Sequence, residues 1–329
     1  MTELLQVSKL EVQFTSRNGV VRAVNGVDFS IKQGEIMALV GESGSGKSIT
    51  ALTLLGLVPK PTGKIANGQI MFDGEDLVKK TEKQYRQIRG QEIAMIFQNP
   101  LTAMDPSFTV GNQMLEIIKY RQGLNKIKAM KEAVKLLELV GIHDPQRVLS
   151  SYPHALSGGM RQRVMIAMAL SCKPKLLIAD EPTTALDATI QLQILELLKK
   201  INRELKTSIL FITHDFGVVA NLCNRVAVMY AGRIVEYGKT EDILQRPQHP
   251  YTIGLMRAMP ELNDNIENKR LKQIEGSPPD LLNLPPGCSF FDRCDIATSA
   301  CREAFPKATI NGEHIVRCFQ REAEQHELN

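Results

Sequence analysis

The sequence predicts an α/β fold with an inserted helical subdomain and a small C-terminal extension. Short β-type runs alternate with turns over the first 75 residues, and a helical pattern occupies about residues 101–149. β-type runs then return on either side of an amphipathic helix at residues 190–205. We therefore expect a main domain over residues 1–245, with the helical subdomain inserted at about 99–165, and an extension over residues 246–329.

The expected strands are short apolar runs bounded by turn residues. In the first part of the chain they are Leu4–Phe14, Arg22–Ile31, Glu35–Val40 and Gln69–Phe72. In the later part they are Lys175–Ala179, Ser208–Ile212, Arg225–Met229 and Arg233–Tyr237. The helix Ile190–Leu205 lies between two of the later strands, and this strand–helix–strand order predicts a parallel layer.

The chain composition is that of a globular protein without a membrane span. Of 329 residues, 43% are apolar, but no apolar run approaches the ~18 residues that a spanning helix needs. No basic and apolar leader opens the sequence, so we expect a cytosolic protein whose membrane role is peripheral, at the cytoplasmic face of the cell (inner) membrane. The net charge of +4 comes from interspersed charges, which does not indicate nucleic-acid binding.

One glycine-rich segment matches a phosphate-binding loop. Residues 41–48 read G-E-S-G-S-G-K-S, follow the apolar strand Ile36–Val40 and open a helical run at Ile49–Leu57. Backbone N–H groups of such a loop surround phosphate, Lys47 reaches the β- and γ-phosphates, and the Ser48 hydroxyl can bind Mg²⁺. The residues expected to contact nucleotide are Gly41, Ser43, Gly44, Ser45, Gly46, Lys47, Ser48 and Ile49.

A second apolar strand ends in two acidic residues. The run Leu176–Ala179 is followed directly by Asp180 and Glu181. The end of a buried strand holds side chains rigidly, so Asp180 is expected to hold Mg²⁺ and Glu181 to polarise an attacking water.

A third motif precedes that strand and carries a family resemblance. Residues 156–162 read L-S-G-G-M-R-Q, in which Ser157, Gly158 and Gly159 form an anion-binding turn before the helix Arg161–Leu170. With this motif the chain resembles the ABC ATPase family over about residues 4–245, although Met160 stands where glutamine is commonest. The resemblance implies an ABC-type P-loop ATPase that dimerises, with two ATP molecules held between two subunits, because the chain has one copy of each motif.

The resemblance also implies roles for residues outside these motifs. Gln98 is similar to the glutamine that senses the metal and the membrane partner, and His214 to the histidine that contacts the γ-phosphate. Asp187 corresponds to the aspartate that touches the partner subunit's site, and Phe14 to the aromatic residue that stacks on adenine. The expected catalytic residues are therefore Lys47, Glu181 and His214, and the expected Mg²⁺ ligands are Ser48, Gln98 and Asp180.

Four cysteines crowd into the extension at positions 288, 294, 301 and 318, whereas Cys172 and Cys223 are expected to be ordinary core thiols. Clustered thiols in a cytosolic protein indicate a metal rather than disulfides. The chain lacks the short C-x₂₋₄-C spacing of most zinc sites, but spacing alone leaves iron–sulfur and zinc open. We expect a structural role that leaves nucleotide affinity nearly intact, and we expect His314 to be a solvated surface residue rather than a ligand.

The extension itself is similar to the C-terminal region of dipeptide and oligopeptide importer ATPases. The similarity lies in Gln248–Thr252 and in Pro285-Pro286-Gly287-Cys288. It implies a [4Fe–4S] cluster on Cys288, Cys294, Cys301 and Cys318, with structural zinc as the alternative. It also implies peptide import with two membrane permeases, a second ATPase subunit or a copy of this chain, and an extracytoplasmic peptide-binding protein. An importer of nickel or another small solute, and a soluble ABC ATPase acting on nucleic acid, remain the alternatives.

Overall fold

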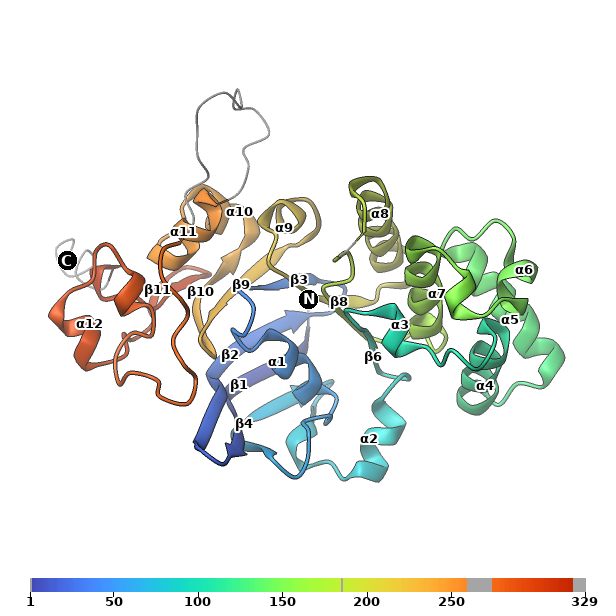
Figure 1. The fold of residues 1–329 in the computed structure, drawn as a ribbon, viewed down its shortest axis with the longest axis horizontal. Coiled ribbons are helices and arrows are strands. Elements are labelled where there is room, and N and C mark those ends of the chain that lie inside the picture. Colours follow the sequence, from blue (N-terminus) through green and yellow to red (C-terminus); the bar gives the residue numbers. More distant parts are fainter. Residues whose placement is uncertain (1, 185, 259–273, 322–329) are drawn as a thin grey trace, which may run out of the picture. The chain divides into compact units, whose positions relative to one another are not determined.

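The computed structural model describes residues 2–184, 186–258 and 274–321, which fall into two compact units (Figure 1). The first unit takes in the described residues of 1–32, 36–79 and 213–329, and the second those of 33–35 and 80–212. Strands and helices alternate in both units, which confirms the predicted α/β class. None of the helices in the described ranges is both long and apolar enough to span a membrane.

The first unit begins with an antiparallel sheet in the order β2-β1-β4-β5. Its strands are β1 (Glu3–Ser16), β2 (Gly19–Lys32), β4 (Gly63–Phe72) and β5 (Glu75–Asp76). β4 is longer than the expected run at 69–72. The prediction missed its first part, G-K-I-A-N-G, because this stretch lacks the apolar alternation that indicates a strand. Gly68 adopts φ 102° there, and an added Cβ would lie 2.5 Å from the Leu10 backbone, so a side chain does not fit.

A second group of strands in the first unit follows the order β3-β9-β10-β12-β11. β3 (Ile36–Val40) pairs in parallel with β9 (Arg225–Tyr230), which pairs antiparallel with β10 (Arg233–Lys239). All five residues of β3 are buried, and burial of the Ile36, Met37, Leu39 and Val40 side chains contributes about 1.5–3 kcal/mol each relative to exposure. The short strands β12 (His314–Val316) and β11 (Thr309–Asn311) then continue the sheet from β10. Residues 309–316 therefore extend the sheet of the first unit.

The helices of the first unit are short. They are α1 (Lys47–Leu54), α9 (Phe216–Leu222), α10 (Thr240–Gln245), α11 (Pro250–Arg257) and α12 (Ser299–Glu303), with 3₁₀ turns η1 (Leu77–Lys79) and η3 (Phe291–Arg293). The proline pairs of the extension lie in loops, as expected of residues that cannot continue a helix.

The second unit contains the parallel strands β6 (Ile93–Ile96), β7 (Leu176–Asp180) and β8 (Ser208–Thr213), with β7 in the middle. The connection from β7 to β8 runs through α8 (Ala188–Leu205), which confirms the predicted strand–helix–strand layer.

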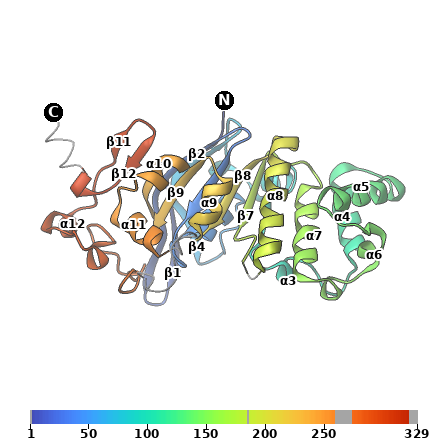
Figure 2. The same cartoon turned by 90° about the horizontal axis from the view of Figure 1, so that it is seen from above.

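Helices dominate the rest of the second unit. They are α2 (Glu82–Ile88), α3 (Pro100–Ala103), α4 (Val110–Gln122), α5 (Lys126–Leu139), α6 (Pro145–Ser150) and α7 (Gly158–Leu170), with the 3₁₀ turn η2 (Pro153–Ala155). Figure 2 shows α4, α5 and α6 gathered beside α7. Each longer helix starts at a side chain that accepts a backbone N–H, including Thr109, Asn125, Ser157 and Asp187.

A buried carboxylate joins β10 to the extension. Glu236 accepts hydrogen bonds from the backbone N–H groups of Gln248 (2.7 Å) and His249 (3.0 Å). His314 Nε2 lies 2.8 Å from Glu236 Oε1, and both residues are buried. The expectation of a solvated His314 is therefore wrong, because β12 places this side chain against the Glu236 carboxylate, which offsets the cost of burying the ring nitrogen.

The two isolated cysteines differ in burial. Cys223 follows α9 and is buried, as expected of a core thiol, and burial raises its pKa. Cys172 is only half-buried.

We expect His249 to make the stability of the first unit sensitive to acid. The Nδ1 atom accepts the backbone N–H of Tyr251, and burial lowers the pKa of His249 from 6.5 to about 4, although the nearby Glu236 carboxylate acts in the opposite direction. Since the unfolded chain binds this proton more readily, stability is lost as pH falls from 6.5 toward 4, by up to about 3 kcal/mol. Above pH 6.5 this contribution is constant.

The measurement compares thermal unfolding of the wild type and His249→Asn from pH 7 to pH 4.5. Asparagine keeps an acceptor for the Tyr251 N–H without a titrating ring, so the variant should lose less stability in acid. Parallel pH profiles for the two proteins would contradict the assignment.

Candidate functional site

The phosphate-binding motif forms the predicted loop between β3 and α1. Lys47 is buried, and its Nζ donates hydrogen bonds to the carbonyl oxygens of Gly41 (2.7 Å) and Glu42 (2.8 Å). The amino group therefore lies inside the turn, where the charge of a phosphate would be placed. Ser43, Gly44 and Ser48 are exposed on this loop, whereas Ser45 is buried and Ile49 is half-buried.

Two glycines of the loop cannot be replaced without moving the backbone. An added Cβ on Gly41 would lie 2.1 Å from the carbonyl oxygen of Met229, and one on Gly46 would lie 2.5 Å from that of Ala23. Gly46 also adopts φ 108°, which side chains other than glycine resist. The loop is thus pressed against β9 and β2, so its N–H groups are held in place before any anion binds.

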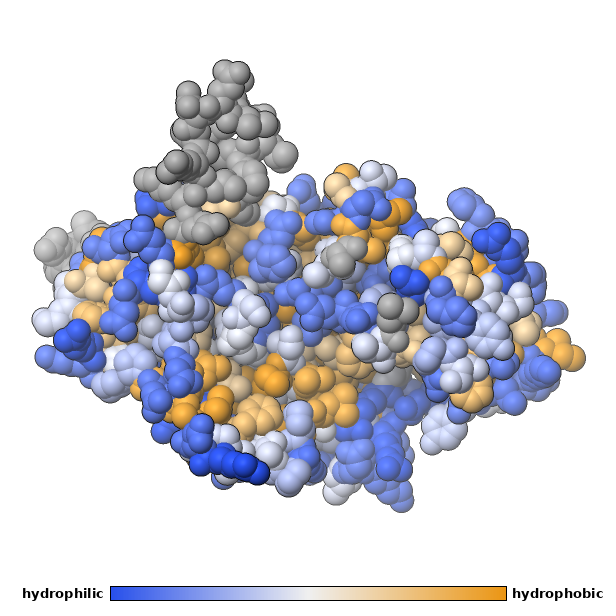
Figure 3. Space-filling view, viewed as in Figure 1, coloured by the Kyte–Doolittle hydropathy of each residue, from blue (hydrophilic) through white to orange (hydrophobic). Residues whose placement is uncertain are grey.

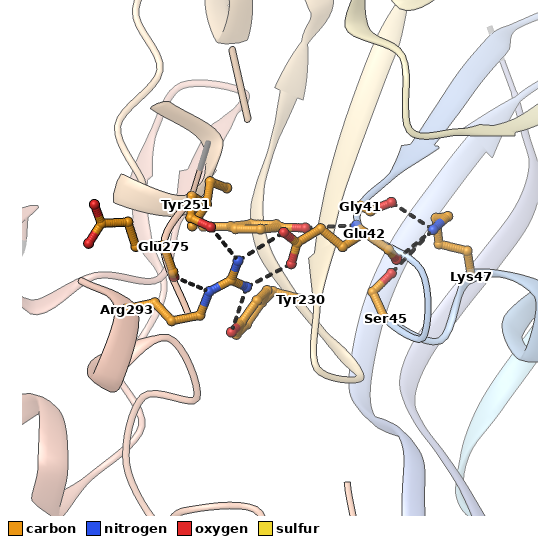
Figure 4. Close-up of polar contacts among 9 residues, drawn as sticks. Gly41, Glu42, Ser45, Lys47, Tyr230, Tyr251, Glu275 and Arg293 are labelled. Atoms are coloured by element: carbon orange, nitrogen blue, oxygen red, sulfur yellow. Dashed lines mark hydrogen bonds and ion pairs between the residues drawn. The ribbon is translucent and has the colours of Figure 1, made fainter. Parts of the chain in front are cut away.

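The second residue of the loop makes contacts that the motif does not reveal (Figure 4). The Glu42 carboxylate accepts two hydrogen bonds from the Arg293 guanidinium, at 2.7 and 3.0 Å, and the Glu42 N–H donates to the Tyr251 hydroxyl at 2.8 Å. Sequence reasoning missed Glu42, Tyr251 and Arg293. The motif leaves the second position unspecified, and no spacing rule connects residues 251 positions apart.

In the second unit, the acidic pair at the end of β7 is held in two different ways. Asp180 is buried at the strand end. Glu181 has φ 46°, a left-handed conformation that is costly for a residue with a Cβ. Its Oε2 accepts hydrogen bonds from Gln98 Nε2 (3.0 Å) and Thr184 Oγ1 (2.9 Å). The structure therefore brings together Gln98 and Glu181, two residues that the sequence places 83 positions apart.

The L-S-G-G segment of the second unit starts α7. Ser157 caps this helix by accepting the N–H of Met160 at 3.3 Å, and Gly158 and Gly159 form the first turn. Asp187 caps the neighbouring helix α8 by accepting the N–H of Ile190 at 2.9 Å. An added Cβ on Gly159 would lie 2.9 Å from Ile190, so the two helix starts are packed together. This places two N–H-rich helix ends side by side with Ser157 exposed.

The two remaining predicted residues lie in the first unit. Phe14 is half-buried near the end of β1, opposite Val21 and Gly63, and its ring lies against the position that a Gly63 side chain would occupy. Figure 3 shows apolar surface over β1, β4 and α1 on the same unit. His214 is exposed and directly follows the end of β8.

All four cysteines of the extension line a single small pocket. The rest of its lining is mostly apolar and includes Pro250, Phe290, Phe291 and Ile296. Cys301 and Cys318 are buried, while Cys288 and Cys294 are half-buried. In the described part of the chain, no three His, Cys, Asp or Glu side chains converge as a single metal ion would require.

Burial in the pocket raises the pKa values of three of its thiols. Burial raises the pKa of Cys288 to about 11, and the other three sulfurs act in the same direction. Burial likewise raises the pKa values of Cys294 and Cys318. Backbone N–H groups partly offset this effect, from Phe290 to Cys288, from Ile296 to Cys294, and from Gln320 and Arg321 to Cys318. Four sulfurs that line one pocket, three of them with backbone N–H donors, are a donor set that fits a thiophilic group.

Comparison with known proteins places both parts of the chain. Residues 24–184 match a family model described as "ABC transporter", and residues 235–301 match one described as "Oligopeptide/dipeptide transporter, C-terminal region". The chain is 49% identical to the dipeptide transport ATP-binding protein DppD of Bacillus subtilis over 320 residues, covering 97% of this chain and 95% of that protein. It is 52% identical to the oligopeptide transport ATP-binding protein OppD of the same organism, covering 97% of this chain and 89% of that protein.

A solved structure shows the same cassette. The dimeric ATP-binding cassette MJ0796, in a post-hydrolysis state bound to ADP and Pi, superposes with a TM-score of 0.64 and 27% identity, covering 72% of this chain and 98% of that chain. Together with the full-length relatives, this likeness establishes the family. The chain belongs to the ABC transporter family of ATPases, in the group that carries the oligopeptide/dipeptide transporter C-terminal region.

Proposed function

We propose that this chain is the subunit that hydrolyses ATP to power the import of dipeptides or oligopeptides through a membrane ABC transporter. The observation that carries the proposal is the presence, in one chain, of a formed phosphate-binding loop and of the C-terminal region shared with peptide-transport ATP-binding proteins. The proposed partners are two membrane permeases and an extracytoplasmic peptide-binding protein, with the chain bound peripherally at the cytoplasmic face of the membrane.

The residues of the phosphate-binding loop are assigned to ATP. Their N–H groups and Lys47 would bind the phosphates, and Phe14 would stack on adenine. Ser48, Gln98 and Asp180 are the residues assigned to Mg²⁺; hydroxyl, amide and carboxylate oxygens are the donors that this ion prefers. When bound, Mg²⁺ would neutralise charge on the phosphate oxygens.

Glu181 is assigned to the attacking water. Gln98 and Thr184 both donate to the same carboxylate oxygen, Oε2, and so orient the side chain. A carboxylate fixed in this way can accept the hydrogen bond of a water and increase its nucleophilicity. His214 is assigned to the γ-phosphate, where it would stabilise charge during phosphoryl transfer.

The L-S-G-G turn is assigned to a second subunit's ATP. Ser157, Gly158 and Gly159 start a helix, and Asp187 starts the helix packed beside it. The similar cassette MJ0796 was solved as a dimer. We therefore propose that the chain pairs with a second ATP-binding subunit or with its own copy.

The four-cysteine pocket is assigned to a [4Fe–4S] cluster, with zinc as the alternative. Each of the four irons of such a cluster binds one cysteine thiolate, so the four cysteine sulfurs surround a whole cluster rather than a single ion. Four sulfurs that line one pocket supply the donors that such a cluster needs, and zinc would take the same thiolates. His249 also lines the pocket, but its Nδ1 is already used by the Tyr251 N–H.

Peptide uptake tests the function directly. We expect vesicles that contain the two permeases, this chain and its partner ATPase to accumulate a labelled dipeptide or oligopeptide when ATP and the binding protein are supplied. Vesicles prepared with Lys47→Ala in this chain serve as the control. ATP-driven uptake of nickel without uptake of peptide would contradict the proposed cargo.

Replacement of Glu181 tests the hydrolytic site. Glu181→Gln should retain ATP binding and lower the rate of ATP hydrolysis at least about 100-fold, because an amide can hold a water but cannot accept its proton. The matched control is Glu196→Gln, which changes an exposed glutamate on α8 of the same unit and should hydrolyse ATP normally. Turnover near that of the wild type in Glu181→Gln would remove Glu181 from the mechanism.

Metal analysis tests the cysteine pocket. Protein purified without oxygen should be brown, from sulfur-to-iron charge transfer, and should contain about four irons per chain. Cys294→Ser should lose most of the iron, whereas Cys172→Ser, outside the pocket, should retain it. Colourless protein with one zinc per chain would show that the pocket holds zinc and not a cluster. Protein with neither metal would contradict both assignments.

A further inference from the structure

Glu42 is held by the C-terminal extension at both its backbone and its side chain. Its N–H donates to Tyr251 on α11, and its carboxylate forms a two-pronged ion pair with Arg293. The Glu42 carbonyl oxygen in turn accepts a hydrogen bond from Lys47 Nζ. One residue of the phosphate-binding loop, Glu42, thus connects Lys47 to two residues of the extension (Figure 4).

Arg293 is arranged to serve this contact. Only 5% of its side chain is exposed, compared with 26% for Glu42, so solvent screens the pair weakly. The other donor directions of the guanidinium are also used: Nε donates to the Glu275 carbonyl (3.0 Å), and Nη1 lies 3.3 Å from the Tyr230 hydroxyl. A planar group fixed on several sides can hold a carboxylate in one orientation.

The aromatic residues around the pair fix its position further. Tyr251 packs on Tyr230 with ring centroids 4.5 Å apart, and Phe290 meets Tyr230 edge to face at 5.2 Å. Tyr251 is fully buried. The hydroxyl that receives the Glu42 N–H therefore has little freedom to move.

Arg293 also lies on the segment that joins two cysteines of the pocket. It ends the 3₁₀ turn η3, which lies between Cys288 and Cys294. Backbone hydrogen bonds close this turn at both cysteines, from the Phe291 N–H to the Cys288 carbonyl (3.0 Å) and from the Cys294 N–H to the Phe291 carbonyl (3.2 Å). The position of the guanidinium is therefore set by the same turn that carries two of the four thiols.

We propose that Arg293 is a positioning residue for the phosphate-binding loop. Arg293 neutralises and orients Glu42, and it thereby sets the affinity of the loop for ATP. The proposal rests on the assignment of residues 41–48 to nucleotide. It differs from the sequence-based expectation that the extension leaves nucleotide affinity nearly intact.

Charge explains why the pair matters for a polyanionic ligand. Without Arg293, the Glu42 carboxylate would remain beside the loop that binds the phosphates, where its charge would repel them and could draw Lys47 away. Removing both charges together would relieve this repulsion. Glu42→Gln should therefore rescue an Arg293 variant, a result that a general loss of stability would not produce.

The test measures binding of Mg·ATP at equilibrium to the full chain, in a Glu181→Gln background that limits turnover. We expect Arg293→Gln to bind ATP at least about tenfold more weakly, and the double variant Glu42→Gln, Arg293→Gln to return to within about threefold of the background protein. Arg302→Gln is the matched control, because Arg302 is an exposed arginine of the same segment that stacks on Phe291. It should bind ATP normally.

Several outcomes would overturn the proposal. Affinity of Arg293→Gln within twofold of the background protein would remove any role in nucleotide binding. A double variant as weak as Arg293→Gln alone would show that Arg293 does not act through Glu42. If Arg293→Gln does not fold, Arg293→Lys keeps the charge without the two-pronged contact and should bind about threefold more weakly; unchanged affinity there would also overturn it. Failure of the background protein itself to bind ATP would instead overturn the proposed function.

Discussion

The hydrogen bonds of the peptide unit between Gly41 and Glu42 are the constraint on which the phosphate site of the first unit depends. Lys47 is buried inside a turn whose carbonyl oxygens must face inward to receive its amino group. Inward-facing carbonyls are unfavourable unless the other side of the peptide is also satisfied. The Tyr251 hydroxyl supplies that partner on the outer side, and Arg293 balances the carboxylate. The loop geometry is therefore a property of the whole unit and not of the motif alone.

Much of the fold could be predicted from local pattern. Apolar runs bounded by turn residues located β3, β7, β8 and β9, because a buried strand needs continuous apolar side chains. The apolar pattern did not locate strands that are short or only partly buried, because such strands do not need continuous apolar side chains. The first half of β4 and the three-residue strands β11 and β12 are short or polar, and their pairing depends on partners far along the chain. The local spacing of residues does not indicate which distant strand a segment pairs with.

The candidate site divides in the same way. Local pattern predicted that Lys47 lies in a loop after a strand and that Ser157 lies at a helix start, while Asp187 was predicted from the family resemblance; the structure has Lys47 in that loop and Ser157 and Asp187 at helix starts. The ion pair of Glu42 with Arg293 and the contact of His314 with Glu236 could not be identified, since a single Glu, Arg or His is usually a solvated residue. Their burial is a tertiary property, and it only becomes visible when the elements are placed in space.

The pairing of β12 with β10 has a consequence for modular exchange of the extension between related proteins. Removing the residues after 246 would leave the buried Glu236 carboxylate without the backbone N–H groups of Gln248 and His249 and without His314, and would leave β10 without its neighbour β12. A chimera that exchanges the extension must therefore keep side chains at positions 293 and 314 that can pair with Glu42 and Glu236, or exchange those two residues as well. The extension therefore depends on a set of matched contacts whose members are scattered along the sequence, and not on a contiguous segment alone.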